Sequence, residues 1–105
     1  MLTYEVTCRV ESGYLEAYER FMREHHIPDL LATGCFTGAE LLRAVPGRYQ
    51  IRYWARSQAD LDRYFAEYAS RFRAEFLSRF PDGVSLARET WAAVQRWETG
   101  PAAPG

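Results

Sequence analysis

The chain has 105 residues, of which 48% are hydrophobic and 26% charged, and a formal charge of −1, values typical of one globular domain. A charge so close to zero provides no field for a phosphate backbone, which argues against nucleic acid as a partner. The sequence has neither an apolar run long enough to span a bilayer nor a signal-peptide pattern after Met1. We therefore expect no membrane partner and a cytoplasmic location.

The domain organisation follows from the same composition. We predict a single domain over residues 1–98 and a flexible C-terminal tail over residues 99–105, where glycine and proline are concentrated. The 7 Tyr, 6 Phe and 3 Trp residues supply enough aromatic surface for a core that needs no disulfides. Two cysteines, Cys8 and Cys35, are too few for a disulfide scaffold.

The first two predicted elements are a strand over residues 2–10, where apolar and polar side chains alternate, and a helix that follows Ser12. Ser12 is the expected N-cap of this helix. The apolar stripe of the helix comprises Tyr14, Leu15, Tyr18, Phe21, Met22 and His25. Pro28 has no N–H to donate, so we expect the helix to end or kink there, before a short further turn that Gly34 closes.

A hairpin and a second helix make up the middle of the chain. Strands are predicted over residues 35–43 and 49–56, joined by a turn at residues 45–48 in which proline precedes glycine, the order of a type II turn. Ser57 begins a pattern that resembles a capping box, with Asp60 as its acidic member. The continuous apolar stripe of the helix comprises Leu61, Phe65, Tyr68, Ala69, Phe72 and Phe76. A final strand is predicted over residues 84–97.

The resulting order of elements is β-α-β-β-α-β. With antiparallel pairing and right-handed crossovers, this order predicts an α+β, ferredoxin-like domain. Its four-stranded antiparallel sheet, in the strand order 4-1-3-2, carries two helices on one face.

The uncovered face of this sheet is either solvated or buried against another surface. Alternation places Thr7, Arg52 and Trp54 on this face, and it adds Trp91 from the final strand. Large aromatic side chains together with arginine are the composition of interface hot spots. An ordinary solvated sheet is the alternative, and we favour a homodimer in which two sheets face each other.

One segment resembles a known family. His26-Ile27-Pro28 and the following residues 31–37 (Leu-Ala-Thr-Gly-Cys-Phe-Thr) are similar to the signature region of the DUF4286 family, small bacterial proteins of unknown function. The resemblance covers residues 2–94 and implies the dimeric α+β barrel superfamily. It implies no activity and no catalytic residue. Where the family usually has an acidic residue before its histidine, this chain has His25.

Candidate ligand-binding residues are the two histidines and three of the tyrosines. The helical stripe selects His25, whereas the resemblance selects His26, and the sequence leaves the choice open. Each is either a histidine near a helix C-terminus or a pocket residue that accepts hydrogen bonds or protons near neutral pH. The three tyrosines, Tyr18, Tyr53 and Tyr68, are on core-facing stripes together with Tyr4, and four buried phenols need partners or water. A polar-lined cavity is therefore an alternative to a plain core.

The chemistry of the chain is otherwise sparse. Adjacent histidines do not chelate one metal as an i,i+4 pair does, and the sequence has no phosphate loop or nucleophile motif. We expect no metal and no cofactor, and the catalytic residues, if any, are unknown. Our first hypothesis is a homodimeric module without evident catalytic machinery that binds a small molecule or a protein. The alternative is a cofactor-independent enzyme for a small aromatic or carbonyl-bearing molecule, with a histidine as acid/base.

Overall fold

The computed structural model describes residues 1–100 and contains a four-stranded antiparallel sheet. Its strands are β1 (Leu2–Val10), β2 (Gly38–Arg43), β3 (Arg48–Ala55) and β4 (Val84–Ala92). They lie in the order β2-β3-β1-β4, which confirms the predicted strand order. β1 pairs with β3 on one side and with β4 on the other, so β4 is an edge strand.

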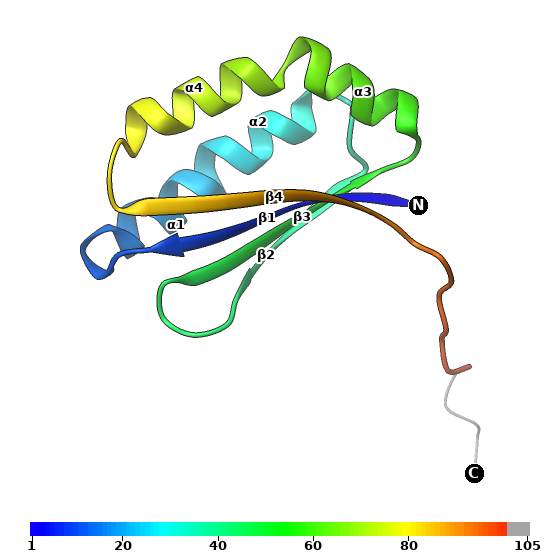
Figure 1. Cartoon of the computed structure of the whole chain (residues 1–105), viewed down its shortest axis with the longest axis horizontal. Helices are drawn as coiled ribbons and strands as arrows, with labels where there is room; N and C mark the ends of the chain where they lie inside the picture. Colours follow the sequence, from blue (N-terminus) through cyan, green and yellow to red (C-terminus); the bar gives the residue numbers. More distant parts are fainter. Residues whose placement is uncertain (101–105) are drawn as a thin grey trace.

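The helices all lie on one face of the sheet, and the other face is bare (Figure 1). The first helical segment consists of a 3₁₀ turn (Ser12–Tyr14), α1 (Leu15–Phe21), a π-helical turn (Met22–His26) and α2 (Ile27–Ala32). The second consists of α3 (Gln58–Glu67) and α4 (Ala69–Arg79). The α+β ferredoxin-like prediction is confirmed, although each of the two expected helices is divided.

Local sequence signals explain several boundaries. Gly47 has a φ of +86°, and the N–H of Arg48 donates to the carbonyl of Val45 over 2.9 Å, as a type II turn requires. The side chain of Ser57 accepts a hydrogen bond from the backbone N–H of Asp60 at 3.2 Å, which confirms the predicted N-cap of α3.

The π-helical turn corrects the predicted stripe of the first helix. The N–H of Ile27 donates to the carbonyl of Met22, five residues earlier, so this turn holds one residue more than an α-helical turn. The stripe therefore continues through His26 and Leu30, whereas His25 is exposed. The assignment of His25 to the buried stripe is wrong for this reason, which a regular helical wheel cannot represent.

Other expected boundaries also differ. Ser12 lies inside the 3₁₀ turn, and no side-chain cap forms there, so it is not the N-cap. The second helix breaks at Tyr68, whose backbone angles of −125° and −37° are not helical. β2 begins three residues later than expected, at Gly38, and β4 ends at Ala92, before Trp97. Of the predicted tail, residues 101–105 lie outside the described part of the chain.

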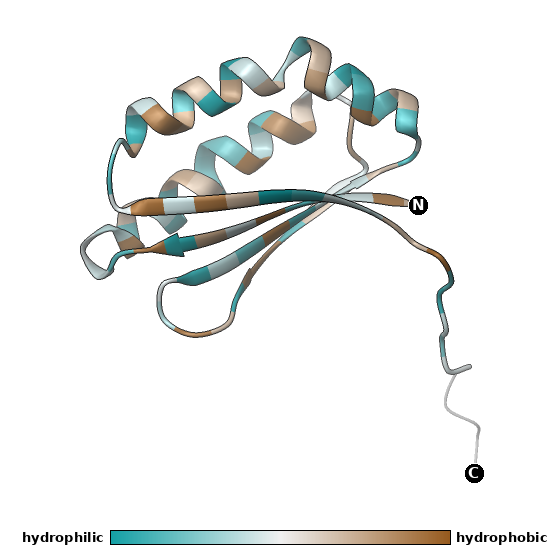
Figure 2. Cartoon of the chain, viewed as in Figure 1, coloured by the Kyte–Doolittle hydropathy of each residue, from teal (hydrophilic) through white to brown (hydrophobic). Residues whose placement is uncertain are grey.

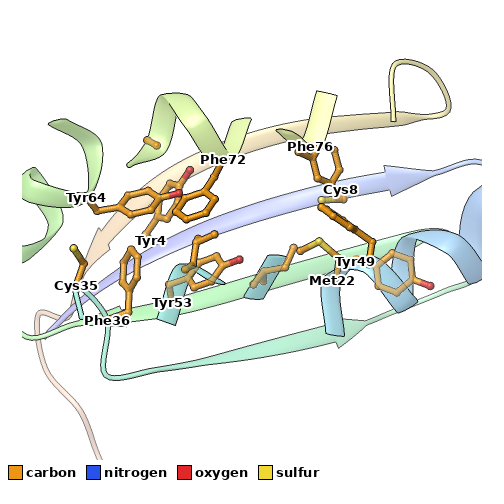
Figure 3. Close-up of a cluster of buried hydrophobic side chains, with 14 of the residues drawn as sticks. Tyr4, Cys8, Met22, Cys35, Phe36, Tyr49, Tyr53, Tyr64, Phe72 and Phe76 are labelled. Atoms are coloured by element: carbon orange, nitrogen blue, oxygen red, sulfur yellow. The ribbon is translucent and has the colours of Figure 1, made fainter. Parts of the chain in front are cut away.

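The core fills the space between the helices and the inner face of the sheet. Aromatic rings dominate it, and Figure 3 shows Tyr64 reaching from α3 toward Tyr4 and Tyr53 on the sheet. The ring centroids of Tyr4 and Tyr53 are 5.9 Å apart, and those of Tyr4 and Tyr64 are 5.8 Å apart. Among the described residues, no helix is long and apolar enough to cross a membrane.

Candidate functional site

A small cavity of about 30 Å³ lies between the sheet and the helices, and we call it the inner cavity. Its lining comprises Tyr4, Val6, Cys8, Tyr18, Met22, His26, Leu30, Ile51, Tyr53, Tyr64, Phe72, Arg73, Phe76, Leu86 and Arg88. This volume is room for about one water molecule, whereas small-molecule sites usually enclose roughly 300 to 1,000 Å³.

Strand alternation and the π-helical turn bring the lining together. Tyr4 and Cys8 lie on the same face of β1 because they are an even number of residues apart, and both are buried under the helices. Tyr53 of β3 pairs with Tyr4 and lies on the same buried face. Tyr18 and His26 are eight residues apart, yet they line the same cavity because the π-helical turn keeps both on the inner side of the segment.

The cavity is bordered by polar atoms in an otherwise aromatic core. The hydroxyl of Tyr18 donates to the Sγ atom of Cys8 over 3.1 Å, and Arg73 donates to the hydroxyl of Tyr4 over 3.4 Å. Among the described residues, the hydroxyls of Tyr53 and Tyr64 have no protein partner. No fully enclosed polar side-chain atom is left unsatisfied there, so these two hydroxyls reach the cavity.

Burial controls the protonation of the lining. It lowers the pKa of His26 from 6.5 to about 4; the charge of Asp29 partly opposes this change, and that of Arg88 adds to it. The imidazole is therefore neutral at pH 7 and offers one donor and one acceptor. Burial raises the pKa of Tyr53 and of Cys8, which keeps the phenol and the thiol protonated.

The predicted ligand-binding residues fall into two groups. Tyr18, Tyr53 and His26 line the inner cavity. His25 is exposed on the outside of the π-helical turn, and Tyr68, which is half-buried at the break between α3 and α4, borders a different surface depression. Whether any of them binds a ligand stays a prediction.

Tyr64, Arg73 and Arg88 line the inner cavity without having been predicted from the sequence, whereas Tyr4 was expected to face the core. One signal was available for Arg88: it follows Val84 and Leu86 at intervals of two, and so it continues the inward phase of β4. A charged residue in an inward phase indicates either an uncovered strand or a site. Arg73 gave no such signal, because arginine on a helix is ordinarily solvated.

The outer face of the sheet carries the four predicted interface residues. Thr3 pairs with Trp54 on one side and with Trp91 on the other, so the two indoles flank it in one row. Arg52 lies in the next row, 3.5 Å from the carboxylate of Glu5 and 3.3 Å from that of Glu40.

Thr7 lies in the following row of the outer face, opposite Gln50. Trp91 is 54% exposed. This face is thus a ladder of polar side chains with two indoles at one end, and no helix covers it (Figure 1).

A second depression, between α1 and the β2–β3 hairpin, is open and charged. Glu19 accepts hydrogen bonds there from the hydroxyl of Tyr49 at 2.6 Å and from Arg43 at 2.9 Å, and it also pairs with Arg23. These partners lower the pKa of Glu19, the Tyr49 hydrogen bond most strongly. This network attaches the hairpin to the helix. Within residues 1–100, no three His, Cys, Asp or Glu side chains gather as a metal site.

The sheet order and the helices on one face define a ferredoxin-like α+β fold. The pattern of the DUF4286 family, described as a domain of unknown function, matches residues 1–94. The chain belongs to this family, which confirms the resemblance found in the sequence. No curated protein matches the chain.

Solved structures with similar folds are distant in sequence. A putative antibiotic biosynthesis monooxygenase from Nitrosomonas europaea is 11% identical, with a TM-score of 0.72 over 90% of this chain and 100% of that one. SnoaB, a cofactor-independent oxygenase from Streptomyces nogalater, is 16% identical, with a TM-score of 0.69 over 90% and 94%. A dimeric ferredoxin-like protein from an uncultured marine organism is 12% identical, with a TM-score of 0.70 over 91% and 97%. At these identities the likeness shows the fold alone.

Proposed function

We propose that the chain is a homodimeric module that binds a small, flat, mainly aromatic molecule in the inner cavity. The observation that carries this proposal is that two tyrosine hydroxyls without protein partners, those of Tyr53 and Tyr64, open onto one void inside the core. Tyr53 is 1% exposed, and its hydroxyl has no protein partner among the described residues. Such a hydroxyl needs a molecule in the void as its partner, because a buried hydroxyl left without any partner costs roughly 1 to 3 kcal/mol.

The chemistry of the lining selects the ligand class. Rings of Tyr4, Tyr64 and Phe72 present flat apolar surfaces, which favour an aromatic ligand. The neutral imidazole of His26 and the Tyr53 hydroxyl offer hydrogen bonds to one polar substituent on such a ligand.

The cavity must open to admit a ring, because its present volume suits a single water molecule. Two features favour opening on the side of β4. Arg73 and Arg88 border the cavity there with exposed, flexible side chains, and β4 has no strand beyond it. Met22, with its unbranched side chain, can move within the lining.

Binding of 1-naphthol, a flat aromatic with one hydroxyl, tests this proposal. We expect saturable binding by calorimetry and a loss of about 5- to 10-fold in affinity for Tyr53→Phe, since one hydrogen bond is worth about 1 kcal/mol. Tyr49→Phe is the matched control on the same strand, because the Tyr49 hydroxyl contacts Glu19 outside the cavity, so its affinity stays at the wild-type value. Absence of saturable binding, or equal losses in both variants, contradicts the proposal.

The alternative function, a cofactor-independent enzyme, has two supporting observations. The fold is similar to that of a protein described as a cofactor-independent oxygenase, and His26 is a neutral imidazole beside phenols. The lowered pKa of His26 makes this residue a weak base in the empty cavity, which favours binding over catalysis. Recovery of 1-naphthol with an altered mass after incubation with the protein in air favours the enzyme, and recovery unchanged favours the binding module.

The homodimer rests on the outer face of the sheet. The row of Arg52 also contains Glu5, Glu40 and Glu89, whereas the far end of the face carries Arg9 opposite Arg48. A surface that is acidic beside its indole end and basic at the other end is complementary to itself after a two-fold rotation. One of the similar structures is described as dimeric, which supports a second copy of this chain as the partner.

A further inference from the structure

Two arginines border the inner cavity without an acidic partner. Among the described residues, Arg73 and Arg88 form no ion pair, which they share with Arg9, Arg48, Arg56, Arg71 and Arg79, but of these seven only Arg73 and Arg88 line the inner cavity. Arg73 lies over the ring of Phe65 at 5.9 Å and donates to the hydroxyl of Tyr4. A guanidinium with five donors keeps most of them free in this arrangement.

Arg88 is exposed, but its position on β4 places it on the side of the sheet that faces the helices. It pairs with Val6 in the β1–β4 register, and Val6 and Cys8 lie on the inner side of the sheet. Arg88 therefore stands on the helix-facing side of an edge strand, at the point where the apolar inward phase of β4 ends. Figure 2 shows this change as hydrophilic residues in the middle of β4, after a hydrophobic beginning.

The field of Arg88 reaches several sides of the cavity. Burial is the main cause of the changed pKa values of Cys8, His26 and Tyr64, and the positive charge of Arg88 lowers all three. Asp29, on α2, is the acidic group that acts on His26 in the opposite direction. The lining itself contains two arginines and no carboxylate, so its formal charge is positive.

We propose that Arg73 and Arg88 bind a carboxylate on the ligand of the inner cavity, so that the ligand class is aromatic carboxylic acids. Arg73 comes from α4 and Arg88 from β4, so both elements contribute donors to the side on which we expect the cavity to open. Arginine suits a carboxylate because its planar fork donates two parallel hydrogen bonds. This inference rests on the proposed function and adds the charge of the ligand to it.

The test compares 1-naphthoate with 1-naphthol, which share the ring and differ in charge. We expect the wild-type chain to bind 1-naphthoate at least about 10-fold more tightly, as charge-assisted hydrogen bonds predict. Arg88→Gln is expected to remove most of this preference, measured as the ratio of the two affinities, and Arg73→Gln is expected to remove it in part. Retained binding of 1-naphthol also shows that each variant is folded.

Arg71→Gln is the matched control, because Arg71 lies on α4 over the ring of Phe72 and does not line the inner cavity. It should keep the full preference for 1-naphthoate. The inference is overturned if the wild-type chain binds both probes equally, or if Arg88→Gln and Arg71→Gln behave alike. If neither probe binds, the proposed function itself fails, which is a different result from binding without preference.

Discussion

Tyr53 and Trp54 are neighbours on β3, but they belong to two surfaces with different environments. Tyr53 faces the helices, is 1% exposed and borders the inner cavity with its hydroxyl. Trp54 faces the bare side of the sheet, where its ring lies against Gly38 of β2, 3.3 Å from the position that a Cβ atom would take. On the inner face, hydroxyls are distributed within an aromatic core. On the outer face, indoles stand at the end of a charged ladder.

The difference shows what each face has to satisfy. The inner face is covered by the helices, so any polar group there needs a partner within the chain, a water molecule in the cavity or a bound ligand. No helix covers the outer face of the single chain, so its charges can be solvated, and the feature left to explain is the row that holds both Trp54 and the exposed Trp91. We infer that a guest explains the first and a second copy of the chain the second.

The largest effect is expected from a charge placed on the outer face. Trp54→Glu should weaken the dimer about 100-fold, because truncating an aromatic hot spot costs at least about 2 kcal/mol and the buried carboxylate adds to this loss. The measurement is the dimer dissociation constant by sedimentation. Leu77→Glu is the control, since Leu77 is exposed on α4, in the helical layer away from this face. A wild-type monomer, or equal effects of both variants, removes the homodimer proposal.

A smaller effect is expected from acid on the inner face. The unfolded chain takes up a proton on His26 near pH 6.5, but the folded chain does so only near pH 4. Between these values the unfolded state holds more protons, so stability falls as the pH is lowered through this window, by about 3 kcal/mol in total. Denaturant unfolding at several pH values measures the loss.

Matched variants isolate the contribution of His26. His26→Gln should make the free energy of unfolding depend less on pH between 6.5 and 4 than it does in the wild type. The pH dependence that remains in this variant comes from the acidic residues. His25→Gln, one position earlier and exposed, should keep the wild-type profile. Identical profiles for all three proteins would mean that His26 is solvated in the folded state.

The smallest effect is expected from the ion pairs of the outer face. Glu40→Gln removes one partner of Arg52, but both side chains are about 40% exposed, so the loss should stay below about 1 kcal/mol. The change is best made in the Trp54→Glu background, where the face is not covered by a second copy, and followed by urea unfolding. Glu24→Gln, exposed and outside the described ion pairs, is the control. A loss above about 2 kcal/mol would show that this face is not solvated in the single chain.

Most of the fold could be predicted from the alternation of side chains in the strands and from the residue types at the turns and caps. Residues 2–10 formed the predicted strand, and the turn at Gly47 and the cap at Ser57 formed as their residue types predict. The ends of β2 and β4 were overestimated, because apolar residues such as Trp97 continue the pattern where no neighbouring strand is left to pair with. A pattern of side chains does not report where hydrogen-bonding partners end.

Less of the candidate site than of the fold could be predicted from the sequence. The placement of His26 depended on one hydrogen bond, from Ile27 to Met22, which changes the helical period at that point. The break at Tyr68 likewise leaves this residue half-buried at the margin of the core, where it stacks on Phe72 and does not line the inner cavity. Tyr64 and Arg73 entered the lining through the packing of α3 and α4 over the sheet, which no local pattern contains.

The two buried free thiols, Cys8 and Cys35, can be used to measure how often the core opens. Cys8 and Cys35 are each 1% exposed; the Cys8 thiol lies on the inner cavity and receives the hydrogen bond of Tyr18, and Cys35 lies just before β2. A thiol reagent can reach either sulfur only when the surrounding elements separate. The rate at which each cysteine is labelled therefore measures how often its part of the interior opens, and a guest in the inner cavity slows the labelling of Cys8 more than that of Cys35.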